Sequence, residues 1–155
     1  MTHLSKGDKA PEFSVKDQNG KEVQLNDFKG KKLVIYFYPK DMTPGCTNQA
    51  CNIRDNFDQL KKEGIEILGV SADDEKRHQK FIDKHELPFT LLADTDKKMI
   101  NDFGIWGEKK FMGKVYDGIH RTTFLVNENG TIHDIIKKPK TKAHSEEILE
   151  SFNNK

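Results

Sequence analysis

A run of six apolar and aromatic residues, Leu33 to Tyr38 (LVIYFY), most constrains what this chain can fold into. Two lysines precede the run and Pro39 follows it. A continuous apolar run of β-forming residues, without polar residues at alternate positions, is typical of a strand buried on both faces. We therefore expect a central strand at 33–38, in a sheet that is covered on both sides.

Strand-like and helix-like segments alternate on either side of that run. An Asn-Gly turn at 19–20 joins 13–15 to 21–25 as a β-hairpin. Further strands are expected at 65–70, 89–93, 113–116, 122–126 and 131–136, and helices at 44–62, 74–85, 96–103 and 144–152. This order predicts a three-layer α/β fold of the thioredoxin-like kind, with an N-terminal β-hairpin, a central mixed sheet and flanking helices.

Length and charge narrow the class of protein further. A chain of 155 residues fits one domain, which we place at 1–155. Its 26 basic and 25 acidic residues leave a net charge of +1, so no long-range field attracts nucleic acid or an anionic membrane. The longest apolar run is far shorter than the roughly 20 residues of a membrane-spanning helix. We therefore expect neither nucleic acid nor a membrane as a partner.

The chain has two cysteines, Cys46 and Cys51. Two are too few for a disulfide scaffold. The first residues lack the apolar segment of a secretory signal, so we expect a cytoplasmic protein, in which thiols are kept reduced. A cysteine pair in that compartment is more often catalytic, redox-active or metal-binding than structural. His78 and His85 lie on a charged helix without a matching cluster, so we expect no metal and no other cofactor.

Cys46 occupies a position that activates a thiol. With Thr43 as the N-cap residue and Pro44 at the first helical position, Cys46 is the third residue of the helix. The first four N–H groups of a helix have no partner within it and carry the positive end of its dipole. Thiolates are favoured at such positions, and the thiolate is the nucleophilic form of cysteine.

The helical spacing sets the two cysteines apart. Cys46 begins an apolar stripe that continues through Ala50, Ile53, Phe57 and Leu60, whereas Cys51 lies about 140° away around the helix. Five residues also separate their Cα atoms by at least ~7.5 Å along the axis, and a disulfide requires ~4.4–6.8 Å. A Cys46–Cys51 disulfide therefore requires the first turns of the helix to unwind.

The segment from Pro39 to Cys46 (PKDMTPGC) resembles the active-site signature of the peroxiredoxins, Pro-x-x-x-Thr/Ser-x-x-Cys. With Cys51 five residues further on, the chain is similar to the bacterioferritin-comigratory, or peroxiredoxin Q, subfamily. The segments GIWG at 104–107, GIHR at 118–121 and FLV at 124–126 agree with it. The resemblance extends from about Lys6 to the final helix.

This resemblance implies a thioredoxin-dependent thiol peroxidase that reduces hydrogen peroxide and organic hydroperoxides. Cys46 would attack the peroxide and become a sulfenic acid, and Cys51 would convert this to an intramolecular disulfide. Thioredoxin or a similar dithiol would reduce the disulfide. We expect the protein to work as a monomer.

The family pattern also implies roles for the residues around the thiol. The Thr43 hydroxyl would bind the thiolate and the peroxide, Arg121 would hold the thiolate and polarise the peroxide, and Pro39 would shape the loop. The free N–H groups of Gly45 and Cys46 lie in the same helical turn. Gln49 is placed to brace Arg121, although many peroxiredoxins carry Glu there, which would pair with the arginine as an ion pair.

Alternatives remain open at this point. Cys51 could be an incidental surface thiol, and His120 could serve in packing at a strand edge rather than in catalysis. The whole chain could be a non-catalytic redox switch or a thioredoxin-fold binding module that senses peroxide through the same cysteines. The Thr43 and Arg121 pattern favours the enzyme, because a sensor does not need the full set. A disulfide oxidoreductase is disfavoured because no Cys-x-x-Cys motif is present.

Overall fold

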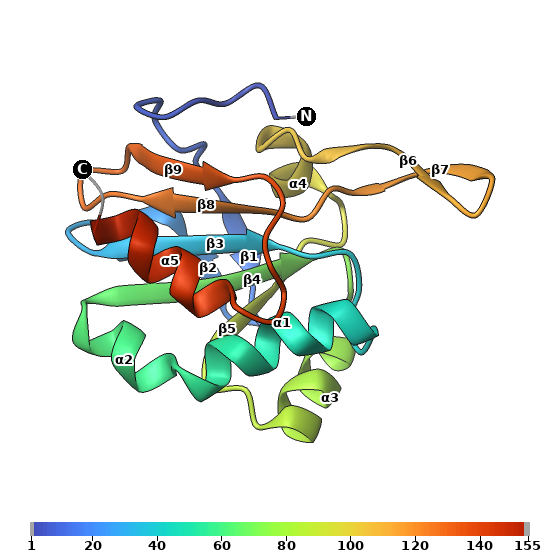
Figure 1. Ribbon diagram of the computed structural model, residues 1–155, viewed down its shortest axis with the longest axis horizontal. Coiled ribbons are helices and arrows are strands. Elements are labelled where there is room, and N and C mark those ends of the chain that lie inside the picture. Colours follow the sequence, from blue (N-terminus) through green and yellow to red (C-terminus); the bar gives the residue numbers. More distant parts are fainter. Residues whose placement is uncertain (1, 154–155) are drawn as a thin grey trace.

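The computed structural model of the chain describes residues 2–153 and centres on a five-stranded mixed sheet (Figure 1). Its middle strand, β3 (Lys32–Phe37), pairs in parallel with β4 (Ile65–Ser71) and antiparallel with β8 (Thr122–Val126). β5 (Thr90–Ala93) extends the sheet beyond β4, and β9 (Ile132–Ile136) extends it beyond β8. The expected central strand and the mixed sheet are both confirmed.

Alternate side chains of β3 point into two different hydrophobic clusters. Leu33, Ile35 and Phe37 belong to one cluster, and Val34 and Tyr36 belong to the other. Because side chains alternate across a strand, each cluster lies on its own face of the sheet. This double burial is the reason that the run lacks polar residues.

Helices cover both faces of the sheet. The cluster that contains Val34 and Tyr36 includes apolar residues of α1 (Pro44–Asp55), α2 (Phe57–Lys62), α3 (Glu75–His85) and α5 (His144–Asn153) (Figure 1). The opposite cluster includes Met99 and Ile100 of α4 (Lys98–Asp102). The three-layer arrangement is therefore confirmed. Within residues 2–153, no helix has the length and apolar character that a bilayer crossing would require.

Two small antiparallel hairpins complete the architecture. β1 (Ser14–Lys16) pairs with β2 (Glu22–Gln24), which confirms the expected N-terminal hairpin, and the 3-10 helix η1 (Leu25–Phe28) follows it. β6 (Trp106–Phe111) pairs with β7 (Lys114–Ile119), and this second hairpin projects from the body of the molecule (Figure 1).

The single helix expected at 44–62 is wrong, because the structure divides it at Asn56. Asn56 ends α1 with φ −115° and ψ 14°, and its side-chain amide donates to Asn52 O at 2.9 Å. Asparagine disfavours helix interiors because its side chain competes for backbone groups. The apolar spacing nevertheless continues across the break, since Leu60 of α2 packs with Ile53 of α1 in the same cluster.

β6 was not predicted from the sequence, and its partner strand is longer than the expected 113–116. The segment WGEKKF has neither a buried face nor an alternation of apolar residues, and all six of its residues are exposed or half-buried. Its only strand partner among residues 2–153 is β7. The strand therefore forms by backbone pairing within a hairpin, which leaves little hydrophobic pattern in the sequence.

Candidate active site

Cys46 lies in the first turn of α1, just beyond the carboxyl end of β3. Thr43 is the N-cap residue, with φ −82° and ψ 153°, and Pro44 begins the helix. The Cys46 side chain is buried, and it packs in the same cluster as Ala50 and Ile53, as the helical stripe predicted. The thiol therefore faces the sheet at the edge where open α/β sheets usually hold their sites.

Arg121 reaches the same thiol from a distant part of the chain. It immediately precedes β8, whose first residue, Thr122, pairs with Phe37 at the end of β3. The antiparallel pairing thus brings Arg121 to the start of α1. Its Nη2 donates to Cys46 Sγ at 3.4 Å, and its Nη1 donates to Gln49 Oε1 at 2.6 Å.

Gln49 and Gly45 fit around this guanidinium. Gln49 is fully buried and accepts from Arg121 without forming an ion pair. A Cβ atom added to Gly45 would lie 3.2 Å from Arg121 Nη2. The absence of a side chain at 45 therefore allows the guanidinium to lie against the first turn of α1. Arg121, Gln49 and Gly45 are brought together around Cys46.

The loop before the helix contains Pro39 and Thr43. The Thr43 hydroxyl forms its hydrogen bond within this loop rather than with Cys46. Thr43 Oγ1 donates to Lys40 O at 2.8 Å. Its oxygen lone pairs can still accept a hydrogen bond. The intervening Met42 has φ 66°, which is unusual for a residue with a side chain. Pro39 is half-buried and lies two residues after the end of β3.

Cys51 is on the same continuous helix as Cys46 and lies apart from the core stripe. Both cysteines are free thiols, and Cys51 is half-buried. α1 is helical from Pro44 to Asp55, so the turns that contain both thiols are wound. This is the geometry in which the two sulfurs cannot join without a change in the helix.

The structure adds a second cation near the thiol that sequence reasoning missed. Lys109 of β6 is half-buried, and its Nζ donates to Ile119 O at 2.9 Å. Burial lowers the pKa of Lys109, the neighbouring Arg121 lowers it further, and the Cys46 sulfur acts in the opposite direction. The charged WGEKKF segment gave no signal for this position, because β6 itself was not predicted.

His120 contacts the hairpin backbone rather than Cys46. Its Nε2 lies 3.0 Å from Glu108 O, and its backbone N–H donates to Ile105 O at 2.7 Å. These contacts tie the end of β7 to the start of β6, directly before Arg121. They favour the packing alternative for His120.

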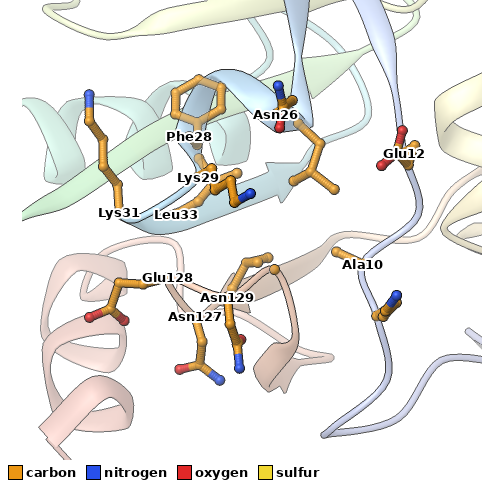
Figure 2. A pocket seen from close by; sticks show the side chains of 14 residues that line it. Ala10, Glu12, Asn26, Phe28, Lys29, Lys31, Leu33, Asn127, Glu128 and Asn129 are labelled. Atoms are coloured by element: carbon orange, nitrogen blue, oxygen red, sulfur yellow. The ribbon is translucent and has the colours of Figure 1, made fainter.

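A separate cavity of about 310 Å³ lies at the opposite end of β3 (Figure 2). Leu33 and Val126 are among the residues that line it, together with Phe28 and Asn127. Leu33 is at the start of β3, whereas Cys46 follows the end of that strand. The cavity therefore contains none of the predicted site residues.

The family model described as "AhpC/TSA family" matches residues 6–135 of this chain. The chain belongs to the AhpC/TSA family. It is 50% identical to Peroxiredoxin Bcp of Escherichia coli K12 over 149 residues, which are 96% of each chain. It is 45% identical to Peroxiredoxin Bcp of Bacillus subtilis over 146 residues, or 94% of this chain and 93% of that protein.

Solved peroxiredoxin structures have the same fold. A mutant of Xylella fastidiosa PrxQ superposes with a TM-score of 0.91 at 29% identity, covering 99% of this chain and 98% of that one. Peroxidoxin BcpB from Mycobacterium tuberculosis superposes with a TM-score of 0.86 at 28% identity, covering 97% of each chain. The chain is therefore a peroxiredoxin with a thioredoxin-like fold, and it is a peroxidase that acts through a thiol.

Proposed function

We propose that Cys46 is the peroxidatic cysteine of this AhpC/TSA family member and that Cys51 is its resolving cysteine. The observation that carries the proposal is the Cys46 thiol in the first turn of α1, with Arg121 Nη2 at 3.4 Å. Unpaired helix N–H groups and a guanidinium both favour negative charge on that sulfur. Within residues 2–153, no Lys or Arg donates a hydrogen bond to Cys51 Sγ, and the nearby Arg54 is bonded to Asp55 and to His85 O.

In the first step, the Cys46 thiolate attacks one peroxide oxygen. The S–O bond forms as the O–O bond breaks, and the sulfur is oxidised by two electrons. The departing oxygen takes a proton and leaves as water or, from an organic hydroperoxide, as an alcohol. Negative charge grows on that oxygen in the transition state, so donors aimed at it accelerate the step.

Arg121 supplies the strongest of those donors. A guanidinium has five N–H groups and stays charged at all working pH values. One nitrogen is committed to Gln49 and another faces the thiol, and the remaining N–H groups can meet a peroxide. The first-turn N–H groups of Gly45 and Cys46 are further donors. Thr43 Oγ1 accepts a hydrogen bond from the peroxide O–H, and Pro39 shapes the wall of the loop.

In the second step, the Cys51 thiol attacks the sulfenic sulfur of Cys46. The S–S bond forms, the S–O bond breaks, and the hydroxyl leaves as water with the Cys51 proton. This step requires α1 to unwind around both residues. A dithiol protein of the thioredoxin kind then returns two electrons and two protons and restores both thiols. We also propose that the protein works as a single-domain monomer in the cytoplasm.

Turnover with a defined reductant tests this function. Hydrogen peroxide consumption should be measured with thioredoxin, its reductase and a nicotinamide reductant, and compared with consumption of an alkyl hydroperoxide. Cys46→Ser should abolish turnover, because a neutral hydroxyl is a poor nucleophile. Cys51→Ser should still react with about one equivalent of peroxide.

The same assay separates the enzyme from a redox switch. A switch would be oxidised once and would not sustain turnover at catalytic concentrations of protein. Sustained turnover in wild type and none in Cys46→Ser supports the proposal, whereas substantial turnover in Cys46→Ser contradicts it.

A further inference from the structure

A buried polar pair lies behind the active-site loop and takes no part in the proposed chemistry. His78 of α3 and Asp41 of the loop are both 0% exposed. His78 Nδ1 lies 2.6 Å from Asp41 Oδ2. Ionisable side chains are seldom completely buried, so this pair needs an explanation.

Hydrogen-bond partners fix the protonation of the pair. The second ring nitrogen, His78 Nε2, lies 2.8 Å from Leu92 O, which can only accept. Tyr38 donates its hydroxyl hydrogen to the other Asp41 oxygen, Oδ1. An ionised Asp41 places an acceptor opposite Nδ1, as Leu92 O does opposite Nε2, and the ring then donates from both nitrogens, which only an imidazolium does. Because imidazole is a stronger base than a carboxylate, we assign the shared proton to His78 and treat the pair as an imidazolium and a carboxylate.

The backbone of Asp41 is held as firmly as its side chain. Its N–H donates to Asp73 Oδ2 at 2.8 Å, and its carbonyl accepts from Arg77 Nη2 at 3.2 Å. The next residue, Met42, has φ 66°, a conformation that carries strain in a residue with a side chain. Thr43, the N-cap residue of α1, follows directly.

We propose that His78 is a positioning residue of the peroxidase site, which as an imidazolium anchors Asp41 and so holds the loop that places Thr43 and the first turn of α1. This inference rests on the proposed role of Cys46. A strained turn persists only where its surroundings hold it in place. Asp41 connects this loop to Arg77 and His78 of α3 and to Tyr38, which follows β3. Misplacing reacting groups by about 1 Å can cost roughly 10²-fold in rate.

Electrostatics agree with this assignment. Burial by itself lowers the pKa of His78, but the hydrogen bond and the charge of Asp41 outweigh burial, and the net shift is upward. The groups that face the ring are Asp41 of the loop, Tyr38 just after β3, and Asp73 before α3. Arg77, on the same helix as His78, is paired with Asp73 at 3.1 Å.

Asp41, Asp73 and His78 also have the composition of a metal-ligand cluster, with their donor atoms within 4.8 Å of one another. Each ligand atom in that cluster already has a hydrogen-bond partner: Asp73 Oδ2 accepts from Asp41 N and from Ser71 Oγ, and both His78 nitrogens are in use. The hydrogen-bonded pair accounts for the cluster without a cation.

The protonation of His78 can be measured in the wild-type protein. Nitrogen-15 NMR of the histidine side chains at pH 7 should show both ring nitrogens of His78 protonated. The raised pKa means that the pair is complete below about 6.5, the usual histidine value, and is lost as pH rises through the higher folded value. A neutral His78 ring at pH 7 would overturn the proposal, whatever the behaviour of any variant.

Rate measurements then test positioning. His78→Gln should slow the single-turnover oxidation of Cys46 by about ten- to a hundredfold. His85→Gln, the matched change on the same helix, should leave the rate within about twofold, because His85 lies outside the pair. Asp41→Asn combined with His78→Gln removes both charges together, so no buried charge is left unpaired. This double variant should recover much of the lost rate.

A pH profile separates positioning from bulk stability. The wild-type oxidation rate should fall at alkaline pH as His78 loses its proton, and the double variant should lack that fall. A folded His78→Gln with the wild-type rate, or a double variant as slow as the product of the two single changes, would contradict the proposal. The NMR measurement tests the His78 proposal without any turnover. Turnover of Cys46→Ser tests the proposed nucleophile, so failure of one proposal can be told from failure of the other.

Discussion

Arg121 is the residue that most directly links the fold to the proposed chemistry. One guanidinium nitrogen contacts Cys46 Sγ, and another contacts Gln49. Lysine keeps the charge, but its single ammonium nitrogen lacks the planar fork with which the guanidinium contacts both partners. We expect Arg121→Lys to lower the rate of Cys46 oxidation by about 10²–10³-fold, the usual cost of a lost donor to a developing oxyanion. Stopped-flow measurement with limiting peroxide checks this. A near-normal rate would show that charge alone is sufficient.

Gly45 offers a finer probe of the same contact. The Cβ of an alanine would lie 3.2 Å from Arg121 Nη2, closer than ordinary van der Waals contact, so the guanidinium must shift by a few tenths of an ångström. We expect Gly45→Ala to slow peroxide reduction by about tenfold, while its better helix propensity keeps the protein at least as stable. Asn48→Ala, an exposed position in the same turn, serves as the control. Unchanged kinetics in Gly45→Ala would mean that Arg121 tolerates displacement.

α1 is the element that must change during the proposed cycle. It is helical through both cysteines, and Asn52, next to Cys51, ties it to α5. Asn52 Oδ1 accepts from Ser145 N at 2.8 Å, and Asn52 Nδ2 donates to Lys142 O at 3.0 Å. Unwinding past Cys51 therefore breaks contacts that hold the start of α5.

We expect oxidation to raise amide hydrogen exchange across 43–54, with a smaller rise at 144–146, while β3 and β4 keep their protection. Exchange should be compared by mass spectrometry on the reduced and the fully oxidised protein, with Cys51→Ser treated identically as the control. Equal protection of 46–54 in both forms, with the Cys46–Cys51 disulfide verified, would show that the helix accommodates the bond or that the pairing is different.

Elements with an apolar pattern or a clear turn signal were predictable, and β6, which lacks an apolar pattern, was not. β3 and the stripe on α1 have strong apolar patterns, because most of their buried positions are apolar. β6 is held by backbone pairing to β7 and has little pattern of its own. The break at Asn56 was missed because the apolar spacing continues from Ile53 to Leu60 across it.

At the scale of the whole molecule, the site depends on contacts between distant segments. Cys46 could be singled out from its place in a helix, but Arg121 is 75 residues away and was implied only by the family pattern. The antiparallel pairing of β8 with β3 is what brings the two together. The Asp41–His78 pair had no local signal, because its two members are 37 residues apart. Lys109 had none because it lies on β6, a strand that was not predicted.

The most direct test of the account is the mass of the protein after one equivalent of hydrogen peroxide. We expect wild type to lose two hydrogens, and the tryptic peptide 41–54, which contains both Cys46 and Cys51, to carry that loss as an internal disulfide. Cys51→Ser should instead gain one oxygen on Cys46, and Cys46→Ser should stay unchanged. Oxygen gained on Cys51 in the Cys46→Ser variant, or a wild-type protein that keeps a stable sulfenic acid with no disulfide, would contradict the assignment of the two cysteines.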